Sequence, residues 1–167
     1  MTFNDLANER YSSRKYLPKP VEKEKLDLIL EAGRIAPSAK NLQPSRVLAA
    51  VSKEALEKIG RTVNLYGAPL GLVVISDRDR AWVRPFDGKG FGDIDSSIVI
   101  TQMMYSAQEL GLGSVWIGYF DPSVLKEDLG LSDTEEVSGI LAVGYRGDET
   151  SNNHGKRRPM SEFAEIV

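Results

Sequence analysis

The sequence contains no cysteine among its 167 residues, which excludes disulfides, thiolate metal sites and a cysteine nucleophile. It also has a single histidine, His154, within the polar stretch SNNHGKRR. A Ser-His-Asp hydrolase would depend on this one base, and a zinc site would need carboxylates in place of the missing ligands. We therefore predict no metal site, and we expect the chemistry of any enzyme built on this chain to belong to a bound cofactor.

Targeting and membrane signals are also lacking. The first ten residues, MTFNDLANER, have no apolar core of the kind that a secretory signal needs. The longest uncharged run in a helix-like segment, 96–108, is polar in part and too short to cross a bilayer. A net charge of −3 argues against broad capture of nucleic acid, which requires a basic face. We expect a soluble, cytoplasmic protein with neither nucleic acid nor membrane as a partner.

The chain is expected to form one domain over residues 1–167, because 41% hydrophobic and 27% charged residues are ordinary values for a globular protein. Apolar periodicity and turn residues alternate along it and predict an α/β or α+β sandwich around one central sheet. The expected helices are 2–10, 21–36, 53–59, 93–110 and 123–129, and the expected strands are 47–51, 71–76, 114–119 and 137–145. Residues 77–92 are expected to form a long loop.

The segment 93–110 is the longest expected helix, and it is apolar on several faces. Gly111 and Gly113 are expected to stop it. So apolar a helix in a small chain should pack against more than its own sheet, and a second copy of the chain is the natural partner.

Arg10, Ser12 and Arg14 are the first candidates for a binding site. If the first helix reaches this far, the two arginines lie four residues apart on one face. Two guanidinium groups and a hydroxyl suit a phosphate monoester, which offers three acceptor oxygens and about two negative charges. A solvated basic patch explains the spacing equally well, so the spacing alone does not decide.

A second candidate is the segment 36–44, with the sequence APSAKNLQP. Its small residues allow close approach of a ligand, and Ser38, Asn41 and Gln43 offer donors and acceptors for a polyol or the edge of a heterocycle. The alternative is a plain turn between helix and strand, since Pro, Ser and Asn are turn residues. The two interpretations are about equally supported.

Two further candidates are weaker. Gly118 lies inside an apolar strand pattern, which marks either close approach of a ligand to the backbone or a buried strand end. The basic cluster 156–158, Lys-Arg-Arg, would complete a phosphate site if the tail folds back, and is otherwise only solvated. The glycines of 88–92 lack the spacing of a dinucleotide loop. Asp87, Asp93 and Asp95 are better explained as solvated acids, with Asp93 as a helix N-cap, than as metal ligands.

Taken in order, these segments resemble the FMN-dependent nitroreductase family over nearly the whole chain. The family has an Arg-x-Ser-x-Arg/Lys element, matched by Arg10 to Arg14, and an Ala-Pro-Ser-x-x-Asn-x-Gln-Pro element, matched by 36–44. It also has a Glu-Leu-Gly-Leu-Gly helix end, a Trp-Ile-Gly segment, a Gly-Tyr strand end and a late basic-Pro element. These are matched by 109–113, 116–118, 144–145 and 157–159. A departure is Ser45, where the family commonly has an aromatic residue.

The resemblance implies a three-layer α+β sandwich with a mostly antiparallel central sheet, a long buried central helix at a dimer interface, and an FMN at that interface. Arg10, Arg157 and Arg158 would hold the phosphate, Ser12 the phosphate or ribityl chain, and Arg14 the pyrimidine edge. The remaining cofactor contacts implied by the resemblance come from the partner's 36–44 segment and from the strand end: Pro37, Ser38, Ala39, Asn41, Gln43, Trp116, Ile117 and Gly118.

The activity implied by the resemblance is an oxidoreductase that passes electrons from NADH or NADPH through FMN to a nitroaromatic, quinone or similar small acceptor. The cycle would be ping-pong, with no essential side-chain acid or base. The loop 77–92 is either a lid, with Trp82, Phe86 or Phe91 over the ligand, or an ordinary exposed loop. The alternatives on the same fold are a dehalogenase, a flavin-consuming enzyme and a non-catalytic FMN-binding protein. An unrelated structural dimer would bind no FMN.

Overall fold

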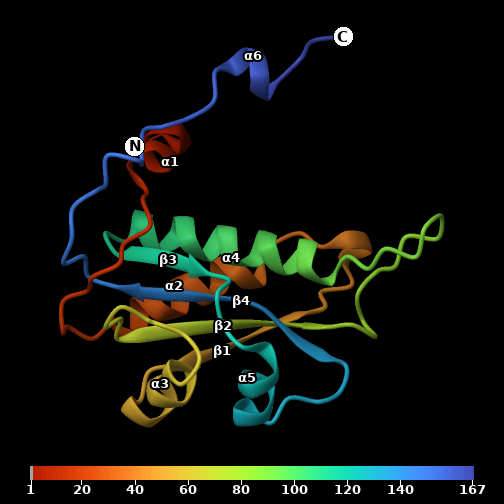
Figure 1. Ribbon diagram of the computed structural model, residues 1–167, viewed down its shortest axis with the longest axis horizontal. Helices are drawn as coiled ribbons and strands as arrows, with labels where there is room; N and C mark the ends of the chain where they lie inside the picture. The colour runs from red at the N-terminus through yellow and green to blue at the C-terminus, as the bar shows by residue number, and fades with distance from the viewer. Residues whose placement is uncertain (1) are drawn as a thin grey trace.

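The computed structural model describes residues 2–167 and places helices on both faces of a four-stranded sheet (Figure 1). In chain order the elements are α1 (Phe3–Glu9), α2 (Lys23–Arg34), the 3-10 helix η1 (Ala39–Asn41), β1 (Ser45–Ala50), α3 (Lys53–Gly60), β2 (Leu70–Asp77), α4 (Gly92–Glu109), β3 (Gly113–Ile117), α5 (Pro122–Leu129), β4 (Glu135–Gly144) and α6 (Met160–Phe163). The strand order is β1-β2-β4-β3, and each adjacent pair is antiparallel. The expected α+β sandwich with an antiparallel sheet is confirmed.

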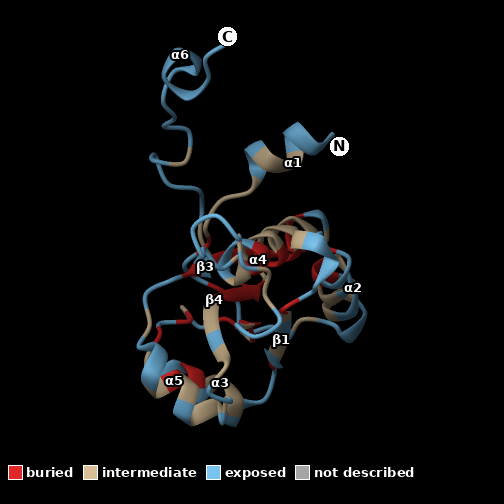
Figure 2. Cartoon of the chain, turned by 90° about the vertical axis from the view of Figure 1, so that its right-hand side faces the viewer, coloured by how far each residue is buried: buried red, intermediate tan, exposed pale blue. Residues whose placement is uncertain are grey.

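The sheet has two apolar faces because successive side chains of a strand point to opposite sides. From β2, Leu70, Leu72 and Val74 pack with residues of α2 and α4, whereas Val73 and Ile75 pack toward α3 and α5. Both faces are thus covered by helices, and buried residues occupy the centre of the molecule (Figure 2). Because helices bury both faces of the sheet, β2 and β4 have continuous apolar sequences rather than alternating ones.

Helix α4 packs closely against α2 because Gly33 leaves room at their contact. A Cβ added to Gly33 would lie 2.9 Å from the Cγ of Met103. Val99, Ile100, Met103 and Ala107 are buried on the inner side of α4. The outer side is different: Ile94, Ile98 and Tyr105 line a hollow of about 580 Å³ together with Phe3 and nearby polar side chains of the helix. Within one chain, therefore, α4 is only partly covered.

The element boundaries differ from the expected ones by a few residues. The first helix ends at Glu9, and Arg10 is already extended (φ −67°, ψ 123°), so the condition under which Arg10 and Arg14 would share one helix face is not met. Asp93 is not the N-cap of α4; Phe91 holds that position without a side-chain cap. Gly111 does end α4, with φ +76°, whereas Gly113 is already the first residue of β3.

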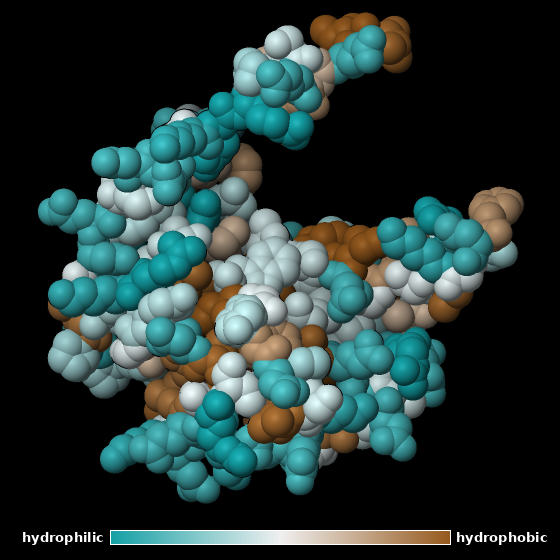
Figure 3. Space-filling model, in the orientation of Figure 1, coloured by the Kyte–Doolittle hydropathy of each residue, from teal (hydrophilic) through white to brown (hydrophobic). Residues whose placement is uncertain are grey.

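Two segments leave the body of the fold. Residues 78–91 form a projecting arm, closed by the bridge between Val83 and Gly90, at the end where α4 begins (Figure 1). Its tip carries Phe86, which is 96% exposed. The tail after β4 runs away from the sheet through α6, with Met160, Phe163 and Ile166 exposed, and hydrophobic atoms lie at its far end (Figure 3).

Within residues 2–167 no helix is long and apolar enough to span a membrane.

Candidate functional site

The segment with Arg10, Ser12 and Arg14 runs as extended chain beside the edge strand β3. Ser12 forms an isolated parallel bridge to Ser114, and the Ser13 N–H donates to the Ser114 carbonyl over 3.1 Å. Ser12 is half-buried and the Arg14 side chain is exposed. The segment is extended rather than helical because its backbone forms hydrogen bonds with the edge of the sheet instead of within itself.

The two arginine side chains of this segment have few partners of their own. Arg14 Nη1 donates only to the Ser12 carbonyl, over 3.3 Å, and neither Arg10 nor Arg14 forms a salt bridge with any described residue. Uncommitted guanidinium groups on a fixed backbone favour an anionic ligand, since they can donate in bidentate fashion.

The outer edge of β3 continues past this segment. Since the Ser114 carbonyl points outward to Ser13, antiparallel alternation also turns the backbone groups of Trp116 outward, while those of Ile117 face β4. The Trp116 side chain is 37% exposed. Gly118 follows directly, and a Cβ added there would meet no atom within 4 Å. A flat ligand can approach the backbone at Trp116 and Gly118 along this edge.

Asp148, which the sequence interpretation missed, holds the backbone of residues 10–14, here called the arginine segment. Its carboxylate accepts the Arg14 N–H over 2.6 Å and the Ser13 hydroxyl, and its carbonyl accepts the Tyr11 hydroxyl over 2.8 Å. The Arg146 guanidinium stacks 4.9 Å from the Tyr11 ring centre. Partial burial raises the pKa of the Tyr11 hydroxyl, which keeps it a donor. No local pattern signals this role, because Asp148 lies 134 residues from Arg14.

The tail does fold back toward the arginine segment at His154. The ring of His154 contacts the Asn8 carbonyl through Nε2 at 2.6 Å and lies edge-on to Tyr11. The basic cluster 156–158 begins two residues later, which brings it near the end of α1. Arg157 is engaged with the tail itself, donating to the carbonyls of His154 and Lys156, whereas Arg158 is exposed.

The segment 36–44 forms a tight loop with unusual backbone geometry. Lys40, Asn41 and Gln43 have φ of +52°, +56° and +49°, in the left-handed region that residues other than glycine rarely adopt. The Ser38 hydroxyl accepts the Gln43 N–H over 2.9 Å. The side chains of Asn41 and Gln43 are exposed and joined to each other, with Gln43 Nε2 donating to Asn41 Oδ1 over 3.0 Å. A turn is present, but it is a strained one that presents polar side chains.

This loop and the arginine segment do not meet within one chain. The Ala39 N–H donates to Asp95 in the first turn of α4, whereas Gln108, in the last turn, contacts Arg146 beneath Tyr11. Asp95 and Gln108 are thirteen positions apart on α4, which is about 20 Å at about 1.5 Å per residue. The structure therefore places Arg10, Ser12 and Arg14 beside β3, the strand that carries Trp116 and is followed by Gly118. It leaves Pro37, Ser38, Ala39, Asn41 and Gln43 at the opposite end of α4.

A cavity of about 550 Å³ lies beside the loop, between α2, β1 and the start of α4. Ser38, Gln43 and Ser45 line it together with the buried Asp95. Ser45, the departure noted in the sequence, bonds Ser96 through the two hydroxyls at 2.9 Å. No group of three or more His, Cys, Asp or Glu side chains suited to a metal occurs among residues 2–167.

Comparison with known proteins gives consistent matches. The model of the nitroreductase family matches residues 7–64 and 60–145. A protein of Archaeoglobus fulgidus, provisionally named NADH dehydrogenase/NAD(P)H nitroreductase, is 30% identical over 148 residues, covering 84% of this chain and 83% of its own. A nitroreductase family protein of Clostridium difficile 630 superposes with a TM-score of 0.95 at 45% identity, over 99% and 98% of the two chains. An FMN-dependent nitroreductase of Clostridium difficile R20291 gives 0.76 at 28% identity, over 92% and 96%.

Proposed function

The chain belongs to the nitroreductase family, and on that premise we propose that it is an FMN-dependent oxidoreductase. It takes electrons from NADH or NADPH and passes them to a nitroaromatic, quinone or similar small acceptor in a ping-pong cycle. The observation that carries this proposal is the pair of uncommitted guanidinium groups, Arg10 and Arg14, held beside the open edge of β3. The names of similar proteins, which include FMN and NAD(P)H, support the choice of cofactor and donor.

In this proposal each residue of the arginine segment binds a different part of FMN. Arg10 and the basic cluster 156–158 bind the phosphate, and Ser12 donates to the phosphate or the ribityl chain. Arg14 lies at the pyrimidine edge, where its positive charge favours the reduced, anionic ring. Trp116 and Gly118 present backbone groups along the ring. FMN, when bound, supplies the redox chemistry, and the protein orients the ligand and shields it from water.

We propose further that the site is shared by two copies of the chain. The loop 36–44 of one copy would meet the arginine segment of the other, since a single chain holds them about 20 Å apart along α4. The half-covered outer side of α4, with Ile94, Ile98 and Tyr105, supports an interface there. The exposed apolar residues of the tail, such as Phe163, support a further contact between the copies.

The oxidoreductase proposal is tested by the visible spectrum and by turnover of the purified protein. A yellow protein that oxidises NADH or NADPH with a quinone as acceptor supports it. Bound FMN without turnover of any acceptor would make the chain a flavin-binding module instead. A colourless protein that takes up no added FMN would contradict both the oxidoreductase and the flavin-binding module, and would favour the unrelated structural dimer.

The shared site is tested by mixing two defective variants. Arg10→Ala impairs the half of the site formed by the arginine segment, and Asn41→Ala impairs the half formed by the loop 36–44. Each variant on its own should therefore bind FMN poorly. Co-expression of the two should restore binding at about a quarter of the sites if copies pair at random, because each mixed dimer contains one site built from intact halves. Absence of any restoration in verified mixed dimers would contradict the shared site.

A further inference from the structure

Asp95 is a buried carboxylate without a cationic partner. It is 2% exposed, and it forms no salt bridge with any described residue. Its Oδ1 accepts the Ala39 N–H over 3.0 Å, whereas no described residue donates to its Oδ2. Burial of an unpaired charge destabilises a fold, and the N-terminal end of α4 offsets this only in part. Because Asp95 destabilises the folded state where it lies, its presence indicates a role other than packing.

The reason lies in what Asp95 holds. The loop bonds within 38–43 are internal: Asn41 N–H to the Ser38 carbonyl, Leu42 N–H to the Ala39 carbonyl, and Gln43 N–H to the Ser38 hydroxyl. They define the shape of the loop but do not fix it to the body. The bond from Ala39 to Asp95 is the side-chain link between this turn and α4. It reaches the loop directly before the strained residues Lys40 and Asn41.

Strained backbone persists only where its surroundings hold it in place. Lys40 and Gln43 gain nothing from the left-handed region by themselves, and only Asn41 tolerates it well. Without the anchor at Ala39, the loop can relax toward ordinary backbone angles. Relaxation would turn the exposed amides of Asn41 and Gln43 away from their present direction, with little effect on the buried core of the sheet.

We propose that Asp95 is a positioning residue, which pins Ala39 so that the strained loop presents Asn41 and Gln43 to the flavin bound by the second copy. This proposal rests on the proposed function, since the loop is given a flavin to meet. It assigns Asp95 to binding geometry and not to the stability of the fold. The two roles predict opposite effects of removing the carboxylate.

The test compares Asp95→Ala, Asp95→Asn and a matched control, Asp93→Ala, in the full chain. Asp93 lies in the same first turn but accepts the Ser138 hydroxyl and does not touch the loop. Asp95→Ala should weaken FMN binding at least about tenfold while the melting temperature of the apoprotein is unchanged or higher, because an unpaired buried charge is gone. Asp95→Asn keeps an oxygen that can accept the Ala39 N–H and should retain affinity within about threefold. Asp93→Ala should leave FMN affinity unchanged.

A coupling measurement separates positioning from general damage. If Asp95 acts through the loop, Asn41→Ala should weaken FMN binding much less in the Asp95→Ala background than in the wild type. Additive losses would overturn the proposal, as would an Asp95→Asn variant that is as defective as Asp95→Ala. A loss of affinity that merely follows a loss of apoprotein stability would overturn it too.

Hydrogen exchange at the Ala39 amide distinguishes failure of this inference from failure of the proposed function. In apoprotein, Asp95→Ala should speed this exchange at least about tenfold, and Asp93→Ala should not. If wild-type protein binds no FMN but the exchange behaves as expected, the proposed function fails and the anchor stands. Unchanged exchange in Asp95→Ala would overturn the anchor whatever the flavin does.

Discussion

The carboxylate of Asp148 accepts the backbone N–H of Arg14 over 2.6 Å, across 134 residues of sequence. The bond fixes the main chain of Arg14, whereas its guanidinium group donates only to the Ser12 carbonyl, so Asp148 supplies the orientation and Arg14 the charge. The same carboxylate binds the Ser13 hydroxyl. Asp148 therefore holds the backbone of the arginine segment, while the side chain of Arg14 is exposed.

Replacing Asp148 should make the backbone of the arginine segment more mobile. Asp148→Ala is expected to weaken FMN binding about tenfold, because charge-assisted hydrogen bonds to the carboxylate contribute about 1.5–3 kcal/mol each in favourable cases. Flavin fluorescence titration measures the effect. Glu149→Gln, at the exposed neighbouring position, is the control and should bind FMN like the wild type. Equal affinity of Asp148→Ala and wild type would contradict the anchoring role.

Arg10 and Arg14 should differ in what they control. Arg10→Ala is expected to weaken FMN retention about tenfold or more, through loss of a phosphate contact. Arg14→Ala should also lower the reduction potential of the bound flavin, because the charge that favours the anionic reduced ring is gone. Each 30 mV of that fall corresponds to about 1.4 kcal/mol for a two-electron couple. Redox titration of both variants measures the difference, and unchanged FMN affinity in both would count against the assignment.

The fold and the site were not equally predictable from sequence. Apolar runs and turn residues located the main helices and strands, because these patterns are local. The conformation of Arg10 to Arg14 was left open by the sequence, since it depends on a bridge from Ser12 to Ser114 that residue spacing does not reveal. The same holds for Asp95 and Asp148, whose partners lie far away in the chain. Contacts that position a site are mostly non-local, and a single sequence does not encode them in its periodicity.

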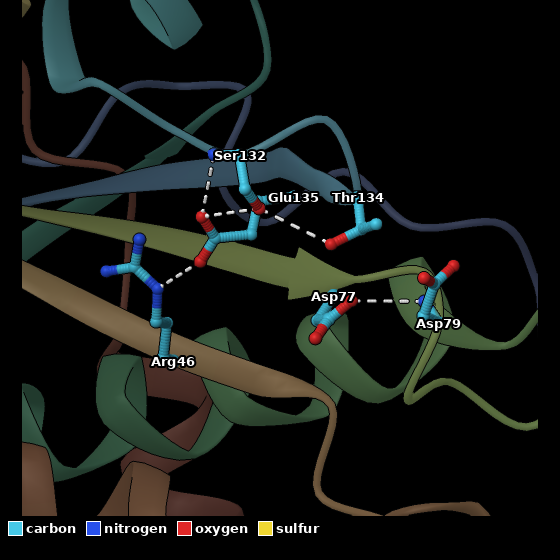
Figure 4. Close-up of polar contacts among 6 residues, drawn as sticks. All are labelled: Arg46, Asp77, Asp79, Ser132, Thr134 and Glu135. Carbon is cyan, nitrogen blue, oxygen red and sulfur yellow. Dashed lines mark hydrogen bonds and ion pairs between the residues drawn. The ribbon is translucent and has the colours of Figure 1, made fainter.

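The ion pair between Arg46 and Glu135 should make stability depend on acid pH. It joins β1 to β4 across β2, and Glu135 also accepts the Ser132 N–H (Figure 4). The Arg46 guanidinium is the main cause that lowers the pKa of Glu135 from 4.5 to about 2. A lowered carboxyl pKa means that the folded state binds fewer protons than the unfolded state below about pH 5. The contribution is complete above that pH and is lost as pH falls toward 2.

The comparison of wild type with Glu135→Gln tests this dependence. Near pH 7 the variant should melt about 2–3 °C lower, since a partly exposed pair of this kind contributes about 1 kcal/mol. The gap should shrink steadily between pH 4.5 and about 2, and high salt should reduce it at neutral pH. A gap that is constant from pH 7 to pH 2 would show that the pair contributes nothing through its charge.

Phe86 at the tip of the projecting arm should control the choice of electron acceptor. The arm is stiffened by the pair of Arg84 with Asp87 and by an edge-to-face contact between the rings of Trp82 and Phe91 at its base. It leaves the fold at the same end of α4 as the loop 36–44, and Lys40 of that loop lies 5.9 Å from the Trp82 ring centre. In a shared site both would reach the second copy, where Phe86 could cover the acceptor.

Phe86→Ala is therefore expected to raise the KM of bulky aromatic acceptors about tenfold, by loss of one buried aromatic contact. The rate at which NADH or NADPH reduces the flavin in a single turnover should change less than about twofold, because reduction does not require the acceptor. Stopped-flow absorbance and steady-state kinetics measure the two quantities separately. Lys89→Ala, on the same arm but away from its tip, is the control. If Phe86→Ala alters neither quantity, the arm is an exposed hairpin and acceptor choice is determined elsewhere.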